Sequence, residues 1–434
     1  MGTLAQTSGR LAATATPQRF ARGLLVVLAR LLALLVLLLL FVPVALLPLT
    51  TAVPWPAWLL LALADAALLV GLFRFHWSRR AAGIALGGAL VVVLLGTAAS
   101  QVWAATPPIV DARGQRPPNS IASLEKVSLN GSEQWITLRG SDVNNPVLLN
   151  LGMGGPGGGG FATRSLFEPL ESHYVVVSWD EPGTGKSYGA VPFSALTPER
   201  YIEDAHALAQ LLRARFHQDK IYVYGVSWTS ILGVWLVQRY PDLFYAYIGN
   251  GQMVNTTEDD RLGYQLALDY LRQRGDTAAL QALERNGPPP YTGSDLVGKY
   301  LAYFDVLNDY MGSPRYAVVV PIVPFMAPEY GLVDKINHTR GLIDTFQAVY
   351  PQLQGVDFET QAARLEVPVY IFAGRNDVNA MSSLVERYFR VLQAPHKELI
   401  WLDGGHGLGD ENLGQFVDIM VNKVLPQTLP AAAR

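Results

Sequence analysis

The chain has 434 residues and contains no cysteine. It can therefore form no disulfide and has no thiolate to act as a nucleophile or a metal ligand. The absence of cysteine does not indicate whether the protein resides in an oxidising or a reducing compartment. Charged residues are also sparse, at 16% of the chain, and the formal net charge is −3. This balance lacks the basic excess typical of nucleic-acid-binding proteins, so we expect no nucleic-acid partner.

The sequence also lacks the signatures of metal and nucleotide sites. No group of His, Asp or Glu residues has the spacing of metal ligands, and we expect no metal and no other cofactor. The segment Pro182–Ser187 resembles a phosphate-binding loop. That motif requires a glycine five residues before Gly185, where Asp180 stands, so we expect no nucleotide site.

Charge is nearly absent from three apolar stretches at about residues 24–49, 55–73 and 81–105. The part 31–49 and the third stretch carry no charge, and the second carries only Asp65. Each stretch is close to the ~20 residues that a helix needs to cross a ~30 Å hydrocarbon core. We predict a membrane domain over residues 1–105 with three transmembrane helices, in which Asp65 faces a neighbouring helix rather than lipid.

Basic residues near the span ends predict the orientation in the membrane, because positive charges favour the cytoplasmic side. Arginines precede the charge-free part 31–49 of the first predicted span and follow the second span, at Arg10, Arg19, Arg22, Arg30, Arg74, Arg79 and Arg80. We therefore expect a multi-pass protein of the cell membrane with a cytoplasmic N-terminus. Three spans then place everything after residue 105 outside the cytoplasm.

The rest of the chain predicts an α/β domain over residues 121–434, joined to the spans by a Pro-rich linker at 106–120. Strand and helix patterns alternate, which favours a mostly parallel sheet flanked by helices. The expected elements are a hairpin at Glu125–Leu138, strands at Pro146–Leu151, His173–Trp179, Ile221–Gly225, Tyr245–Gly249, Val367–Ala373 and Glu398–Leu402, a helix opening at Thr197 and a closing helix at Leu413–Val424.

Between about residues 254 and 360 the chain is helical and aromatic instead. An insertion between late strands of such a sheet lies over their carboxyl ends, so we predict a helical lid.

One strand runs directly into a serine. In Ile221–Trp235 an apolar β-rich run breaks at Gly225, reaches Ser227 and continues as a helical pattern. A hydroxyl at such a strand-to-helix turn is exposed for nucleophilic attack, and the motif prefers small residues two before and two after it. Gly225 meets that preference and Thr229 does not, so a buried serine in an ordinary turn stays open as an alternative.

A serine nucleophile needs a base and an orienting carboxylate. Asp377 follows one late strand in Gly374-Arg-Asn-Asp377, and His406 follows the next in Gly405-His406. Their order after Ser227 is that of α/β-hydrolases. Asp403 is a fallback for the carboxylate, and the other histidines of the α/β domain are expected to be solvated: His173, His206, His217, His338 and His396.

The glycine-rich loop after the strand at Pro146–Leu151 is the candidate oxyanion hole. Backbone free of side chains can approach a substrate closely, and N–H groups stabilise the negative charge of an acyl-transfer transition state. We expect an N–H of Gly154 or Gly155 to act with that of Trp228.

These residues resemble the proline iminopeptidase group of α/β-hydrolases over about residues 120–425. The matching segments are Met153-Gly-Gly-Pro-Gly157, Trp179–Ser187, Gly225-Val-Ser-Trp-Thr-Ser230, Gly374-Arg-Asn-Asp377 and Gly405-His406. The resemblance implies an α/β-hydrolase fold with Ser227 as nucleophile, His406 as general base and acid, and Asp377 as its orienter.

Three positions depart from that group: Met153 replaces a histidine, Pro182 an arginine and Thr229 a glycine. The group reads the substrate's free amine with lid carboxylates. Here Gln252 and Glu258 are the candidate substrate-binding residues, with Asp259 and Asp260 beside them. For the acidic run Glu258–Asp260 we expect a solvated helix start, with substrate binding as the alternative.

Three hypotheses for function follow. The first is a membrane-anchored serine hydrolase that acts through an acyl-enzyme as an aminopeptidase on short peptides or amides. The second keeps the triad but hydrolyses esters or lipids. The third is an inactive hydrolase-fold membrane protein that binds a ligand or partner; protein partners stay unknown in all three.

Overall fold

The computed structural model describes residues 17–313 and 323–430. Two compact units are present: Met1–Leu49 with Val53–Ala99, and Thr50–Ala52 with Ser100–Arg434. The described part of the first unit is helical, and the second is an α/β unit.

The first unit consists of α1 (Pro17–Thr50), α2 (Trp55–Arg74) and most of α3 (Arg79–Val102). All three helices are long and apolar enough to cross a membrane, as the sequence predicts. Most of their leucines and valines are exposed, which only an apolar surrounding would favour. Asp65 is buried, as expected if it faces a neighbouring helix. The third helix ends at Val102, three residues before its predicted end.

The second unit is built on an eight-stranded sheet in the order β1-β2-β4-β3-β5-β6-β7-β8. The first two strands form the predicted hairpin, and β2 pairs antiparallel with β4, whereas all other neighbouring strands of the sheet pair parallel. The strands are β1 (Ile121–Leu129), β2 (Ser132–Gly140), β3 (Val147–Asn150), β4 (Val175–Asp180), β5 (Ile221–Ser227), β6 (Phe244–Gln252), β7 (Val369–Gly374) and β8 (Lys397–Leu402). The predicted strands are all present, with ends shifted by a few residues.

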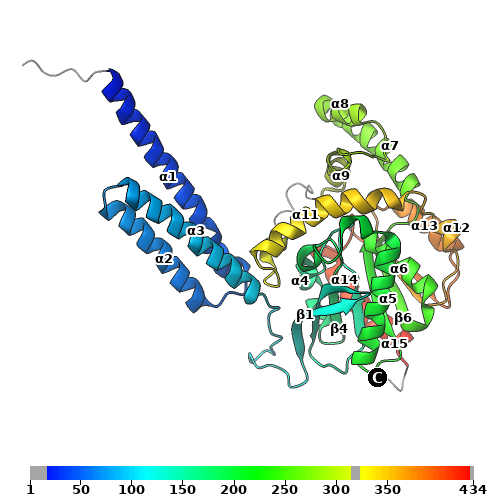
Figure 1. The fold of residues 1–434 in the computed structure, drawn as a ribbon. Helices are drawn as coiled ribbons and strands as arrows, with labels where there is room; N and C mark the ends of the chain where they lie inside the picture. The colour runs from blue at the N-terminus through cyan, green and yellow to red at the C-terminus, as the bar shows by residue number, and fades with distance from the viewer. Residues whose placement is uncertain (1–16, 314–322, 431–434) are drawn as a thin grey trace, which may run out of the picture. The chain divides into compact units, whose positions relative to one another are not determined.

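Helices cover both faces of this sheet, because its strands are apolar on both sides (Figure 1). One face packs against α5 (Pro198–Arg215), α6 (Trp228–Arg239) and α13 (Ser382–Val391). The other packs against α4 (Arg164–Phe167) and the C-terminal helix, which runs from α14 (Asp410–Ile419) through a π-helical stretch at Met420–Val424 to α15 (Leu425–Thr428). Thr197 caps α5 as predicted, its hydroxyl accepting from the Arg200 N–H at 3.2 Å.

The segment between β6 and β7, called the lid segment below, is helical where the structure describes it. Its elements are α7 (Thr256–Arg274), α8 (Thr277–Asn286), α9 (Leu296–Met311), the 3₁₀ turn η6 (Val323–Met326), α11 (Leu332–Val349) and α12 (Phe358–Gln361). Figure 1 shows α11 crossing above the strands, with α8 and α9 on its far side. A β-carbon on Gly157 would lie 2.2 Å from the Gly341 carbonyl, so α11 packs directly on the loop that follows β3.

Candidate active site

Ser227 lies at the junction of β5 and α6 in a strained conformation. Its φ of 57° and ψ of −123° are ones that non-glycine residues rarely adopt. The turn is tight, since a β-carbon on Gly225 would lie 2.3 Å from the carbonyl oxygen of Thr229. Strand and helix thus approach as closely as a nucleophile elbow requires.

Thr229 occupies the elbow position where the related group has glycine, and its hydroxyl is part of the turn. The hydroxyl accepts a hydrogen bond from the Val226 N–H at 2.9 Å. It lies 3.0 Å from the carbonyl oxygens of Val226 and Gly152, to which it can donate. The side chain therefore connects the elbow with the glycine-rich loop after β3.

Asp377 and His406 are brought together from the loops after β7 and β8. His406 Nδ1 lies 2.8 Å from Asp377 Oδ2. The other carboxylate oxygen accepts the N–H groups of Asn379 and Ala380, each at 2.9 Å. This buried carboxylate is therefore held in one orientation against the imidazole.

The His406 ring also packs on β6. A β-carbon on Gly251 would lie 2.9 Å from Cε1 of the ring, so only glycine fits there. Burial lowers the pKa of His406, but the charge of Asp377 and its hydrogen bond raise it more, and the net pKa is above the ordinary histidine value. The fallback Asp403 does not contact the ring; it is almost fully exposed and pairs with Arg375.

The glycine-rich loop has a backbone that only glycine supports. Gly152, Gly154 and Gly157 have φ of 118°, 94° and 90°. The loop is tightly folded, since a β-carbon on Gly158 would lie 1.8 Å from the Met153 carbonyl. The ring of Phe346 on α11 closes over Gly155, 2.9 Å from where its β-carbon would stand.

Glu181, just after β4, joins this loop to the start of α6. Its Oε1 accepts the Gly157 N–H at 2.9 Å. The indole N–H of Trp228 lies 3.3 Å from Oε1 and 3.2 Å from Oε2. Burial raises the pKa of Glu181 to about 8. The side chain thus ties together the two backbone segments predicted to supply oxyanion donors.

The two candidate substrate-binding residues differ in burial: Gln252 is buried, whereas Glu258 is partly exposed. Gln252 is buried, and its amide bonds the Tyr247 hydroxyl at 2.6 Å and the Met253 carbonyl at 2.8 Å. Those bonds hold the end of β6. Glu258 lies near the surface of α7 and forms an ion pair with Arg261 at 2.7 Å.

A model of the alpha/beta hydrolase fold family matches residues 145–288. The "Probable aminopeptidase YbaC" of Bacillus subtilis (strain 168) is 30% identical over 285 residues, covering 64% of this chain and 88% of that protein. The chain belongs to the α/β-hydrolase family.

Solved structures agree with that fold. The proline iminopeptidase of Mycobacterium smegmatis matches the hydrolase with a TM-score of 0.50 at 16% identity, covering 72% of this chain and 100% of that chain. A membrane phospholipase A, described as a bacterial virulence factor, matches with a TM-score of 0.52 at 18% identity, covering 84% and 100%. At these identities the likeness concerns the fold alone.

Two acidic residues of the lid segment are buried, although the sequence predicts them on a solvated surface. The expectation of a solvated helix start is wrong for Asp259 and Asp260, which are both buried. Asp259 accepts the Met381 N–H at 2.8 Å, and burial together with Asp377 and Asp260 raises its pKa well above the ordinary value. It therefore supports the loop that carries Asp377. Burial raises the pKa of Asp260 to about 7, and its carboxylate accepts the Tyr300 hydroxyl at 2.8 Å.

His338 is a third residue of the lid segment that is buried although the sequence predicts it to be solvated. On α11 it turns inward, is 4% exposed and lies 3.4 Å from the Gly159 N–H through Nε2. Burial lowers its pKa to about 4.

Nearby Asp180 accepts the Tyr330 hydroxyl at 2.7 Å and the Lys186 N–H at 3.0 Å, and burial raises the pKa of Asp180 to about 7. In the sequence, the signal that could have identified Asp180 and Glu181 is a pair of consecutive carboxylates at the end of an apolar strand.

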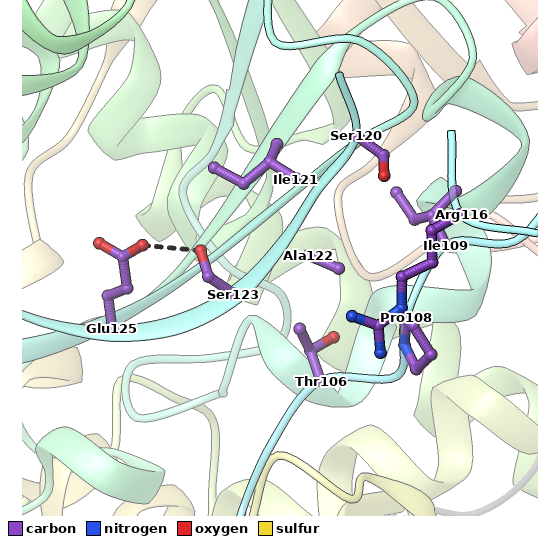
Figure 2. A pocket seen from close by; sticks show the side chains of 9 residues that line it. All are labelled: Thr106, Pro108, Ile109, Arg116, Ser120, Ile121, Ala122, Ser123 and Glu125. Atoms are coloured by element: carbon purple, nitrogen blue, oxygen red, sulfur yellow. Dashed lines mark hydrogen bonds between the residues drawn. The ribbon is translucent and has the colours of Figure 1, made fainter. Parts of the chain in front are cut away.

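A cavity of about 300 Å³ lies elsewhere on the hydrolase, between the linker and the edge strand β1 (Figure 2). None of the triad candidates lines it. Among the described residues, no group of three or more His, Asp or Glu residues is placed to hold a metal ion.

Proposed function

We propose that this hydrolase is a membrane-anchored serine enzyme that cleaves short peptides or amides, in the manner of an aminopeptidase. Ser227 is the nucleophile, His406 the general base and acid, and Asp377 the residue that orients the imidazole. The aminopeptidase name of the Bacillus subtilis relative supports this substrate class.

The proposal rests on the imidazole–carboxylate pair, whose ring packs on Gly251 of β6, the strand paired with the one that ends at the strained Ser227. The bond from His406 Nδ1 to Asp377 leaves Nε2 for the serine hydroxyl. His406 takes the hydroxyl proton as Ser227 attacks the carbonyl carbon, then gives it to the leaving amine as the carbon–nitrogen bond breaks. Water, deprotonated by the same imidazole, then cleaves the acyl-enzyme and regenerates the serine.

The transition state carries negative charge on the carbonyl oxygen. The Trp228 N–H opens α6, where the helix dipole is positive, and Gly154 or Gly155 supplies a second N–H. The lid segment closes this site, since Phe346 lies on Gly155 and Met311 of α9 lies by Gly405. It would restrict the site to small substrates.

The three apolar helices are the proposed membrane anchor, with the N-terminus in the cytoplasm and the hydrolase unit outside it. Arginines in the first half of α1 and at the turn from α2 to α3 support this orientation, at Arg19, Arg22, Arg30, Arg74, Arg79 and Arg80.

The test is hydrolysis by the full-length protein in detergent or liposomes. An aminopeptidase cleaves prolyl and other aminoacyl arylamides with a free amine and not their N-acetylated forms. Ser227→Ala must abolish that activity. Equal cleavage of free and acetylated substrates would exclude an aminopeptidase, and absence of all Ser227-dependent turnover would exclude the enzyme.

A second candidate is an esterase or lipase. The lid segment places an aromatic cluster beside the oxyanion loop, in which Phe346 stacks on Tyr350 at 4.3 Å and Tyr300 packs edge-on against both. Phe346 brings this buried cluster into contact with Gly155, and an apolar contact there suits an acyl chain as well as a proline ring. A panel of acyl esters of rising chain length distinguishes the two candidates. Turnover that rises with chain length, while aminoacyl amides stay uncleaved, favours the esterase or lipase.

A further inference from the structure

Four exposed apolar side chains lie on η6 and the first turns of α11. They form what we call the apolar patch: Phe325, Met326, Val333 and Ile336, which are 39%, 68%, 41% and 60% exposed. Burying such side chains is favourable, and their grouping on one short segment marks an interaction surface.

The two parts of the patch are fixed to each other. Lys335, itself buried, donates to the carbonyl oxygens of Pro324 at 3.0 Å and Ala327 at 2.8 Å. These bonds hold η6 against α11. The lysine charge is therefore turned inward, while Val333 and Ile336 on the same turns face outward.

The start of α11 is also bonded to the last turn of α3. The Leu332 N–H donates to the Ser100 hydroxyl at 2.9 Å, and the Gln101 amide donates to Asp334 at 3.1 Å. Contact is close, since a β-carbon on Gly331 would lie 2.9 Å from the Ser100 carbonyl. Ser100 and Gln101 belong to the same compact unit as α11.

If α3 spans the bilayer as proposed, that last turn lies at the membrane surface. The third candidate span ends at Val102, and Trp103, which is 42% exposed, follows it. Tryptophan is enriched at the boundary between hydrocarbon and headgroups. A helix that starts beside Ser100 and Gln101 therefore starts at this boundary.

We propose that the apolar patch docks into the surface of the bilayer that holds α3, so that the lid segment is anchored to lipid as well as to protein. Apolar side chains of an interfacial helix enter the boundary between headgroups and acyl chains. The inference rests on the proposed insertion of α3. It links lipid to the site, because Gly341 and Phe346 of the same helix pack on the oxyanion loop.

Absence of cysteine makes a direct test possible. Single-cysteine variants of the full chain carry an environment-sensitive fluorophore and are reconstituted in phosphatidylcholine–phosphatidylglycerol liposomes, with or without lipids bearing a quencher near the headgroup. Ile336→Cys and Met326→Cys report the patch. Leu94→Cys, exposed on α3, reports insertion of the span. Val391→Cys on α13, an apolar side chain of similar exposure to Val333, is the matched control.

We expect blue-shifted emission and at least about twofold quenching at residues 336 and 326, and neither at 391. Ile343, roughly 10 Å further along α11 from Ile336, should be quenched less when replaced by labelled cysteine. Quenching at 94 without quenching at 336 and 326 would overturn docking and leave the anchor intact. No quenching at 94 would overturn the anchor itself, and docking with it.

Discussion

Glu181 and Trp228 are joined by the indole N–H, which lies 3.2 Å from the carboxylate, while the same carboxylate accepts the Gly157 N–H at 2.9 Å. One buried side chain thus connects the glycine-rich loop with the residue that follows Ser227. Its replacement should change the alignment of the site without touching the triad.

We predict that Glu181→Ala lowers kcat by on the order of 10–100-fold, because a small displacement of oxyanion donors is costly. Glu181→Gln keeps an acceptor for the Gly157 N–H and should retain most of the activity. Steady-state rates on the best substrate of the panel measure both. Equal rates for Glu181→Ala and the wild type would show that Glu181 does not position the loop.

Glu181 also predicts a pH effect on stability. Burial raises its pKa to about 8. Between the ordinary carboxyl value of about 4.3 and that pKa, the folded state holds a proton that the unfolded state has released, so stability falls as pH rises through this window. Glu181→Gln lacks the titration. Its melting temperature relative to the wild type should therefore increase from about pH 5 to about pH 9, and a constant difference would contradict this.

The pH profile of hydrolysis should report His406. The general base must be neutral, so kcat/KM should fall on the acid side through a pKa above the ordinary value of about 6.5. Asp377→Asn removes the charge that raises this pKa and should move the acid limb to lower pH, besides lowering kcat by roughly 10⁴-fold. Asp403 is exposed and lies three residues before His406. Asp403→Asn should change neither the acid limb nor kcat, and a shift of the acid limb in this variant would contradict the assignment of Asp377 as the orienting carboxylate.

Thr229 should contribute to stability through its hydroxyl. In Thr229→Val the shape is kept, but the bonds with Val226 and Gly152 are lost, and buried groups without partners cost about 1–3 kcal/mol. Thr229→Ser keeps the hydroxyl and should lose less. Denaturant unfolding compares the two; similar losses would mean that the methyl group, not the hydroxyl, matters.

The orientation in the membrane can be read from labelling by an impermeant maleimide in intact cells. Gln273→Cys, exposed on α7, should react from outside. His76→Cys, between α2 and α3, should react only after permeabilisation. The reverse pattern would place the hydrolase unit in the cytoplasm.

The meeting of Asp377 and His406 follows from the sequence, because the carboxyl ends of neighbouring parallel strands share one edge of the sheet. The hairpin, the parallel strands and the apolar helices were equally predictable from period and length. Ser227 follows its strand directly, so its place at the same edge follows too.

The burial of Asp259, Asp260 and His338 could not be predicted in this way. Each polar side chain lies in a helical lid segment whose local pattern resembles a solvated surface. Their burial depends on how α7 and α11 pack onto distant loops, as Gly341 does on Gly157. Thr229 departs from the small residue that the elbow motif prefers, and only the structure shows that its hydroxyl contacts both the turn and the glycine-rich loop.

The most direct test of the central claim is covalent labelling of Ser227. Membranes that contain the full-length protein are treated with a fluorophosphonate, and the modified residue is located by mass spectrometry. Ser230→Ala is the control: it removes a buried serine hydroxyl in the first turn of α6, which donates to the Ser227 carbonyl at 2.6 Å, and leaves the Ser227 hydroxyl in place. We expect labelling of the wild type and Ser230→Ala at Ser227, and none in Ser227→Ala. Labelling that persists in Ser227→Ala, or folded wild-type protein that takes no label, would contradict that claim.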